Sequence, residues 1–92
     1  MPQQVQILMM PAFKRSYKKL HANQKSAANK AIEVIRDTPE IGVPKRGDLS
    51  GVFVHKFNCI GQEMLLAYEY DPLMRLLLAL GVQENFYRDL KK

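Results

Sequence analysis

Residues 65–81, LLAYEYDPLMRLLLALG, contain two β-strand patterns on either side of a turn. The first pattern belongs to a segment, Glu63 to Tyr70, that we expect to be a strand. Asp71-Pro72 then turns the chain, as such pairs commonly do. The second segment, Leu73 to Leu80, is apolar apart from Arg75, as expected of a strand buried near the centre of a sheet. Together they predict two neighbouring strands.

A further strand is expected just before this pair. Val52 to Phe57 is rich in residues that favour strands. Asn58 to Gln62 contains a glycine and has the character of a hairpin turn. Glu40 to Ser50 contains proline and glycine and is expected to be a loop. Because the connections between the three strands are short, we predict an antiparallel meander.

The first half of the chain shows a short strand followed by helical periodicity. Val5 to Met9 is short and apolar, and Ala12 to Leu20 follows a proline that suits the first turn of a helix. A second helix is predicted with Asn23 as its N-cap, ending before Thr38-Pro39. It has an apolar stripe at helical spacing, made of Ala28, Ala31, Ile32 and Ile35. The short link between the helices predicts a helical hairpin.

These segments predict a single α+β domain over residues 1–92. The N-terminal strand and the helical hairpin are expected to pack on an antiparallel sheet of three to four strands, and Glu84 to Leu90 to form a short C-terminal helix. The apolar stripe of the hairpin needs a large apolar surface, so the hairpin should cover one face of the sheet. The opposite face is then expected to be free for a partner.

Composition limits the classes of function. The 92 residues carry 14 Lys and Arg against 9 Asp and Glu, a formal net charge of +5, which favours an anionic partner such as RNA, DNA, an acidic protein or a membrane face. A single cysteine, Cys59, fits a reducing cytosol, and no apolar run is long enough to span a membrane. The sequence has neither metal-ligand spacing nor a glycine-rich phosphate loop, so no cofactor is expected and we predict a cytoplasmic protein.

Several stretches together resemble the RelE/ParE superfamily of bacterial toxins, and they span nearly the whole chain. The similar segments are FKRSYKKL at 13–20, KRGDLSGVF at 45–53, LAYEY at 66–70, LALG at 78–81 and ENFYR at 84–88. The resemblance implies the fold predicted above. It also implies a toxin of a type II toxin–antitoxin system, held inactive by a cognate antitoxin protein.

Two mechanisms are known in this superfamily. RelE-like toxins cleave mRNA in the decoding site of the ribosome, and ParE-like toxins poison DNA gyrase. Cleavage through a ribose 2′-hydroxyl needs a base, an acid and cations for the phosphate charge. In RelE-like toxins these groups lie on the open sheet face, and an aromatic residue near the C-terminus stacks on a base.

The resemblance carries over residue by residue. It places Lys56 where the middle strand carries Lys, Arg or His, and Tyr87 at the closing aromatic position, as catalytic candidates. Val54 and Leu65 stand where RelE-like members carry further cations. The substrate-binding candidates are Gln83 and Arg88 in the closing segment, and Lys45 and Arg46 on the loop before the sheet.

Strand alternation leaves one ambiguity. His55 should point to the face opposite Lys56, but a shift of one residue in register would exchange the two.

We therefore predict a growth-arresting toxin acting through ribosome-dependent mRNA cleavage, an endoribonuclease with Lys56 and Tyr87 at its site. The neutral residues at Val54 and Leu65 leave a non-enzymatic gyrase inhibitor as the alternative. A plain RNA-binding module is a third possibility. Growth arrest on expression separates either toxin from that module.

Overall fold

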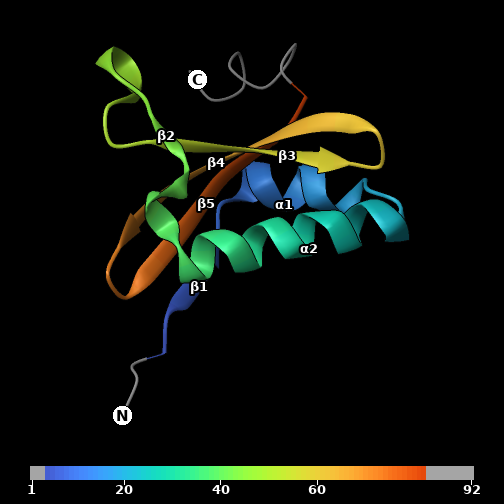
Figure 1. Cartoon of the computed structure of the whole chain (residues 1–92), viewed down its shortest axis with the longest axis horizontal. Coiled ribbons are helices and arrows are strands. Elements are labelled where there is room, and N and C mark those ends of the chain that lie inside the picture. Colours follow the sequence, from blue (N-terminus) through green and yellow to red (C-terminus); the bar gives the residue numbers. More distant parts are fainter. Residues whose placement is uncertain (1–3, 83–92) are drawn as a thin grey trace.

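The computed structural model describes residues 4–82, which form a sheet covered on one face by two helices (Figure 1). The strand order is β1-β5-β4-β3-β2. In chain order the elements are β1 (Gln6–Met9), α1 (Pro11–Lys18), α2 (Ala22–Asp37), the 3-10 turn η1 (Pro39–Ile41), β2 (Val43–Pro44), the 3-10 turn η2 (Gly47–Leu49), β3 (Phe53–Cys59), β4 (Gln62–Asp71) and β5 (Met74–Gly81). No helix of this part of the chain is long and apolar enough to cross a membrane.

The predicted α+β class is confirmed, and the meander of β3, β4 and β5 is antiparallel as expected. The sheet has five strands instead of three or four. The N-terminal strand β1 pairs in parallel with β5, which makes the sheet mixed. The fifth strand, β2, is only two residues long and lies within the segment expected to be a loop. The predicted helix at 84–90 lies outside the described residues.

The start of α2 differs from the prediction. The helix begins at Ala22, and its N-cap is His21 instead of Asn23. The side-chain oxygen of Gln24 accepts a hydrogen bond from the backbone N–H of His21 at 2.8 Å, which is one half of a capping box. Asn23 is exposed in the first turn.

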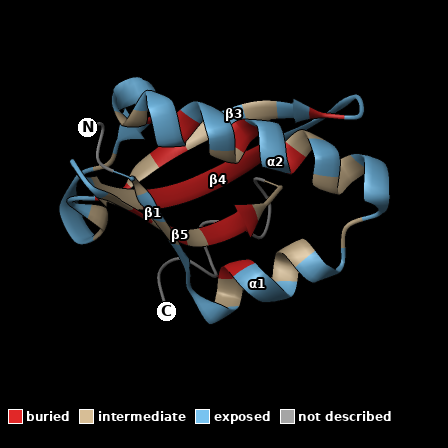
Figure 2. Ribbon diagram, turned by 90° about the horizontal axis from the view of Figure 1, so that it is seen from below, coloured by how far each residue is buried: buried red, intermediate tan, exposed pale blue. Residues whose placement is uncertain are grey.

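The main core lies between the helices and the sheet, where α1 packs on β5 and α2 on β3 (Figure 2). Its buried residues come from both helices and from all three meander strands: Phe13, Ala31, Ile35, Cys59, Met64, Leu66, Tyr68, Leu77 and Leu80. The expected stripe of α2 faces this core, because Ala28, Ala31 and Ile35 are buried. Ile32 is only partly buried at its edge.

This difference gives a test of the helix orientation. Ile35 is 0% exposed, so Ile35→Val should lower the free energy of unfolding by about 1 kcal/mol through loss of a buried methyl group. Ile32→Val, at the rim, should cost clearly less. Urea denaturation of both variants measures the two values, and equal losses would mean that the rim position is as buried as the central one.

A second, smaller apolar cluster occupies the opposite face of the sheet. It contains Val52, Val54, Leu65, Ala67 and Ala79, and Leu49 of η2 packs against it. The expectation that this face is free for a partner is therefore wrong for its central part, because the η2 segment contributes an apolar side chain to it.

Tyr68 holds the segment after α2 against the sheet. Its side chain is 0% exposed, and its hydroxyl donates to the carbonyl of Pro39 and accepts from the N–H of Gly42 at 3.0 Å. A Cβ at Gly42 would lie 2.5 Å from that hydroxyl oxygen, so a side chain at position 42 would push Tyr68 away. The path from α2 to β2 therefore depends on this tyrosine and this glycine.

Tyr68→Phe should lower the free energy of unfolding by roughly 1–3 kcal/mol, because it leaves two backbone groups without their partner. Tyr17→Phe is the matched control, since the Tyr17 hydroxyl donates to Asn29 in an exposed bond of 2.8 Å. That variant should lose no more than about 0.5 kcal/mol. Equilibrium unfolding in urea compares the two, and similar losses would argue against a specific role of the Tyr68 hydroxyl.

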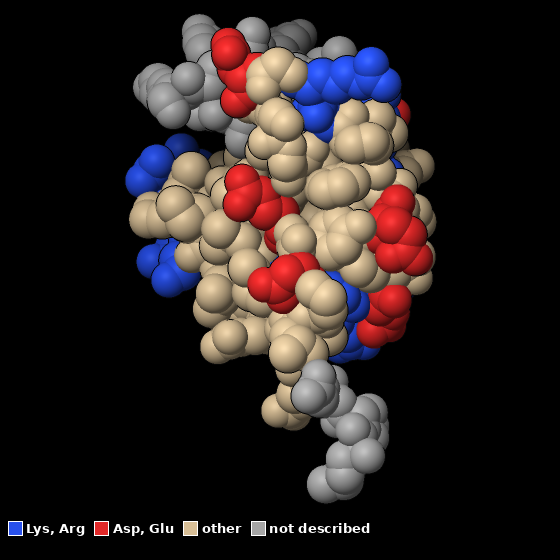
Figure 3. Space-filling view, turned by 90° about the vertical axis from the view of Figure 1, so that its left-hand side faces the viewer, with Lys and Arg blue, Asp and Glu red and all other residues tan. Residues whose placement is uncertain are grey.

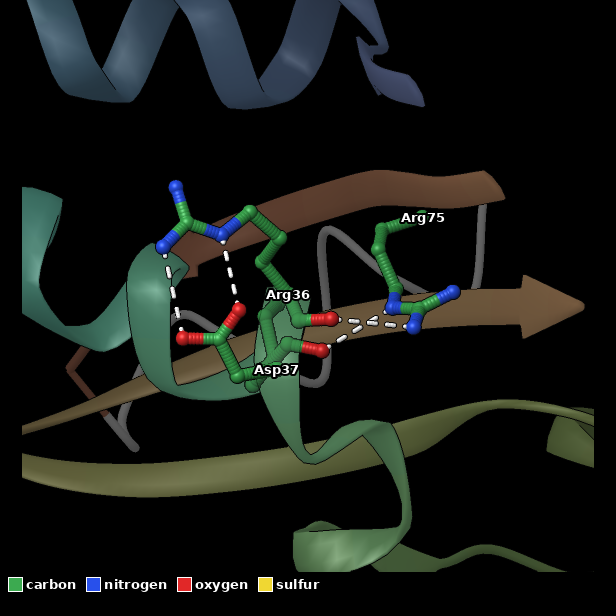
Figure 4. Close-up of polar contacts among 4 residues, drawn as sticks. Arg36, Asp37 and Arg75 are labelled. Atoms are coloured by element: carbon green, nitrogen blue, oxygen red, sulfur yellow. Dashed lines mark hydrogen bonds and ion pairs between the residues drawn. The ribbon is translucent and has the colours of Figure 1, made fainter. Parts of the chain in front are cut away.

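Arg75 is the one charged side chain buried among residues 4–82, with 4% exposed. Its guanidinium donates to the carbonyls of Ile35 and Arg36 at the end of α2, at 3.0 and 2.9 Å (Figure 4). It also donates to the carbonyls of Asp71 and Met74, at 2.6 and 3.0 Å. The last carbonyls of a helix have no partner within the helix, so Arg75 joins the end of α2 to the β4–β5 turn.

Candidate functional site

Lys56 lies on β3, on the sheet face opposite the helices. Val54, two residues earlier, belongs to the apolar cluster of that face, and side chains two apart in a strand point the same way. Lys56 is exposed and has no hydrogen bond or ion pair with any residue in the range 4–82. Its ammonium group is therefore accessible to a ligand.

A hollow of about 270 Å³ adjoins Lys56 at the β3–β4 hairpin. Its lining residues are Lys56, Phe57, Asn58, Gly61, Gln62 and Glu63. The hairpin closes through Ile60 and Gly61, with φ of 54° and 77°, the left-handed values that a two-residue hairpin turn needs. The side chain of Asn58 supports this turn by accepting the N–H of Gly61 at 2.9 Å.

Glu63 is a neighbour of Lys56 that was not predicted from the sequence. In the register of β3 and β4, Lys56 pairs with Leu65 and Asn58 pairs with Glu63. Lys56 and Glu63 are therefore diagonal neighbours on one face, about 7–8 Å apart in the backbone. A two-residue turn at 60–61 fixes this register. The sequence pattern predicts a turn within 58–62 and does not specify which two residues form it.

The two positions that flank Lys56 are buried, so a charged side chain would be unfavourable at either of them. Val54 is 2% exposed and Leu65 is 1% exposed, both within the apolar cluster. A cation at either position would have to be buried among apolar side chains, which is costly without a partner. Within the described part of the chain, Lys56 is the sole Lys or Arg on this face of β3, β4 and β5.

His55 faces α2, as strand alternation predicted, and not the hollow beside Lys56. It lies in a groove of about 360 Å³ that residues of α2, including Lys30 and Val34, also line. Its ring stacks on Phe57, with centroids 6.2 Å apart. Burial lowers the pKa of His55 below its usual 6.5, which favours the neutral form of the ring.

Cys59 has the properties of a small core residue. It is 1% exposed, its thiol lies 3.8 Å from the carbonyl oxygen of Gln24, and burial raises its pKa. A raised pKa disfavours the reactive thiolate. Residues 4–82 also contain no group of three or more His, Cys, Asp or Glu side chains that could hold a metal ion.

Of the other predicted site residues, the structure describes Lys45 and Arg46, and neither lines the hollow. Lys45 and Arg46 lie between β2 and η2, where the N–H of Lys45 donates to the carbonyl of Val52 at 2.8 Å. Val52, which Lys45 contacts, is four residues before Lys56. This corresponds to roughly 13 Å along an extended strand, so the loop cations lie away from Lys56. Gln83, Tyr87 and Arg88 lie outside the described residues.

Comparisons with known proteins identify the family. The family described as ParE-like toxin of type II bacterial toxin–antitoxin system matches residues 7–91. The chain belongs to this toxin family.

Solved structures show the same fold at low sequence identity. The toxin is similar to the toxin–antitoxin complex RelBE2 of Mycobacterium tuberculosis, with a TM-score of 0.71, 18% identity and coverage of 90% of this chain and 95% of that chain. It is also similar to a mutant of the E. coli toxin RelE in the free state, with a TM-score of 0.69, 13% identity and coverage of 89% and 86%. The YoeB/ParE toxin of Agrobacterium tumefaciens matches with a TM-score of 0.69, 14% identity and coverage of 86% and 99%. None of the curated protein sequences matches the toxin.

Proposed function

We propose that this toxin arrests growth by cleaving mRNA on the ribosome, with the hollow at the β3–β4 hairpin as its reaction site. The observation that carries the proposal is that an accessible cation, Lys56, and a carboxylate, Glu63, line the same hollow. A carboxylate accepts protons and an ammonium group both donates them and offsets phosphate charge. The pair thus supplies the minimum set of groups for cleavage of a phosphodiester.

The reaction is an internal transfer at phosphorus. Glu63 takes the proton of a ribose 2′-hydroxyl, whose oxygen forms a bond to the adjacent phosphorus. The bond from phosphorus to the 5′-oxygen of the next nucleotide breaks, and Lys56 donates a proton to that leaving oxygen. The products are a 2′,3′-cyclic phosphate and a free 5′-hydroxyl. Tyr87 remains the candidate for stacking on a base, and Gln83 and Arg88 for contacts to the RNA.

The partners follow from this function. A cognate antitoxin is expected because complexes such as RelBE2 pair a toxin of this fold with an antitoxin. The ribosome and mRNA are polyanions, for which a net charge of +5 is suited.

Inhibition of DNA gyrase without catalysis is the second candidate, and one observation favours it. Val54 and Leu65 bury apolar side chains where RelE-like toxins carry cations, and an inhibitor that acts by binding needs no such cations.

Two assays on the purified toxin separate these functions. We expect single-turnover cleavage of mRNA on programmed ribosomes and no effect on DNA supercoiling by gyrase. Inhibited supercoiling without any cleavage would replace the first proposal by the second. Expression in bacteria with and without the adjacent small gene tests the toxin–antitoxin relation, and normal growth with abundant folded toxin would point to a plain RNA-binding module.

A further inference from the structure

The strand β1 is an edge of the sheet, with β5 as its neighbour on one side. The N–H of Gln6 donates to the carbonyl of Leu73 and the N–H of Met10 to that of Leu77, both at 2.9 Å. In a parallel ladder every second residue bonds to the same neighbour. The backbone groups of Gln6, Leu8 and Met10 therefore face β5.

The residues between them face away from the sheet. The N–H and C=O groups of Val5, Ile7 and Met9 point to the open side of β1, and they have no hydrogen-bond partner within residues 4–82. Such a row of unpaired groups is a template on which another strand can pair.

This edge lacks the features with which proteins usually prevent such pairing. The stretch QVQILMM at 4–10 contains no charged residue and no proline, and the side chains of Leu8, Met9 and Met10 are exposed. Figure 3 shows uncharged side chains at the lower end of the face in view, where the described chain begins. Edge strands are commonly protected by lysine, by proline or by their shortness.

The other side of the sheet is protected in all three ways. The strand β2 has only two residues, and the second of them is Pro44. Beyond the residues of β3 that pair with β2, the exposed Lys56 follows. The open edge of β1 is therefore the better surface for strand pairing.

We infer that β1 binds a second copy of this toxin, by antiparallel pairing of the two β1 strands about a twofold axis at Ile7. The outward groups at 5, 7 and 9 are symmetric about position 7. Val5 of one copy then pairs with Met9 of the other, and Ile7 pairs with its own equivalent. A twofold interface of this kind uses the same surface on both copies.

The absence of charge on residues 4–10 is the reason for choosing a second copy as the partner. A charged segment finds no complementary charge on this edge, whereas two identical uncharged edges meet without repulsion between their side chains. Each copy carries a net charge of +5, so the remaining repulsion between the copies is long-range and is screened by salt. Pairing should therefore become tighter as salt is added, whereas salt weakens the binding of a polyanion.

The dimer leaves the proposed reaction site open. In the strand order, β5 and β4 lie between β1 and β3, so the hollow beside Lys56 is on the far side of each sheet. The inference does not rest on the proposed reaction, and Lys56→Ala should dimerise as the wild type does.

Sedimentation velocity of the full chain at roughly 5 to 500 µM tests the association, in about 0.1 M and about 0.5 M salt. Pairing of one strand edge buries a small area, so we expect a dissociation constant on the order of 10 to 100 µM. The constant should be lower at the higher salt concentration. A toxin that stays monomeric over the whole range, or that dimerises more weakly at high salt, would overturn the inference.

Met9→Pro tests whether the dimer uses the outward groups of β1. Proline removes the N–H that points away from β5 and is tolerated on the free side of an edge strand. The variant should dimerise roughly 10- to 100-fold more weakly, because each copy loses a hydrogen bond to the other. Met9→Leu keeps the N–H and an apolar side chain, so it should dimerise nearly as the wild type does. Equal dimerisation by the two variants would place the interface elsewhere.

Ile7→Cys tests the register without depending on how proline affects folding. Two residues opposite each other in a hydrogen-bonded antiparallel pair have Cα atoms about 5.5 Å apart, which suits a disulfide. With oxidised glutathione the variant should form a covalent dimer on a non-reducing gel, whereas Gln4→Cys, exposed on the same segment but distant from its equivalent, should not. Cys59 is buried in both variants. Crosslinking of Gln4→Cys in preference to Ile7→Cys would contradict the proposed pairing.

Discussion

Arg75→Ala is expected to lower the free energy of unfolding by roughly 3–5 kcal/mol. The substitution leaves the carbonyls of Ile35 and Arg36 without the donor that they have at 3.0 and 2.9 Å (Figure 4). Each buried carbonyl left unpaired costs about 1–3 kcal/mol. The positive charge at the C-terminal end of α2, which stabilises the helix dipole, is also lost.

Arg36→Gln is the control for this experiment. Arg36 is next to the same helix end, but its side chain is exposed and pairs with Asp37 at 2.9 Å. Such a surface pair contributes at most about 1 kcal/mol. Urea denaturation gives the comparison, provided that the free energy of unfolding falls with urea concentration at the same slope in all variants. A loss for Arg75→Ala no greater than that for Arg36→Gln would show that the end of α2 does not depend on the buried guanidinium.

Arg75 also shows which features of the fold can be predicted from the sequence and which cannot. The apolar run of 73–80 correctly predicted a strand inside the sheet, because the apolar character of that segment can be recognised from its own residues. The role of its one charged residue could not be predicted in this way, since two of the four carbonyls that accept its hydrogen bonds lie about 40 residues earlier, in α2. A contact of this kind becomes visible only when the packing of helix and sheet is known.

The edges of the sheet were harder to predict than its centre for a similar reason. The parallel pairing of β1 with β5 joins segments almost 70 residues apart, and no local pattern specifies it. The strand β2 has only two residues, Val43 and Pro44, both exposed, so it has no alternation to detect. The meander of β3 to β5, by contrast, follows from short turns.

The candidate site was predicted in part. Strand alternation correctly assigned Lys56 and His55 to opposite faces, and it requires only the period of a β-strand. Glu63 was missed because its proximity to Lys56 depends on the register of the hairpin. The burial of Val54 and Leu65 was missed because it depends on Leu49 and the cluster around it, which a residue pattern within one strand does not encode.

If the hollow is the reaction site, Lys56→Ala should slow single-turnover cleavage of mRNA on ribosomes by roughly 10²-fold or more, the usual scale for loss of an acid–base group. Glu63→Gln should have an effect of similar size, because the amide keeps the shape but cannot take a proton. Both residues are exposed, so thermal unfolding should remain close to that of the wild type.

The controls for this prediction separate chemistry from charge. Arg36→Ala removes another exposed cation, which lies near the C-terminal end of α2 and away from the β3–β4 hairpin, so its cleavage rate should change little. Tyr87→Phe keeps the ring that we expect to stack on a base and should cause only a small loss. Cleavage that is unchanged by Lys56→Ala, or lost to the same extent in Arg36→Ala, would remove the hollow as the reaction site. Slow cleavage by both Lys56→Ala and Glu63→Gln, with a normal rate for Arg36→Ala, would assign proton transfer to the β3–β4 hairpin. The reason is that Lys56 and Glu63 both line the hollow at that hairpin.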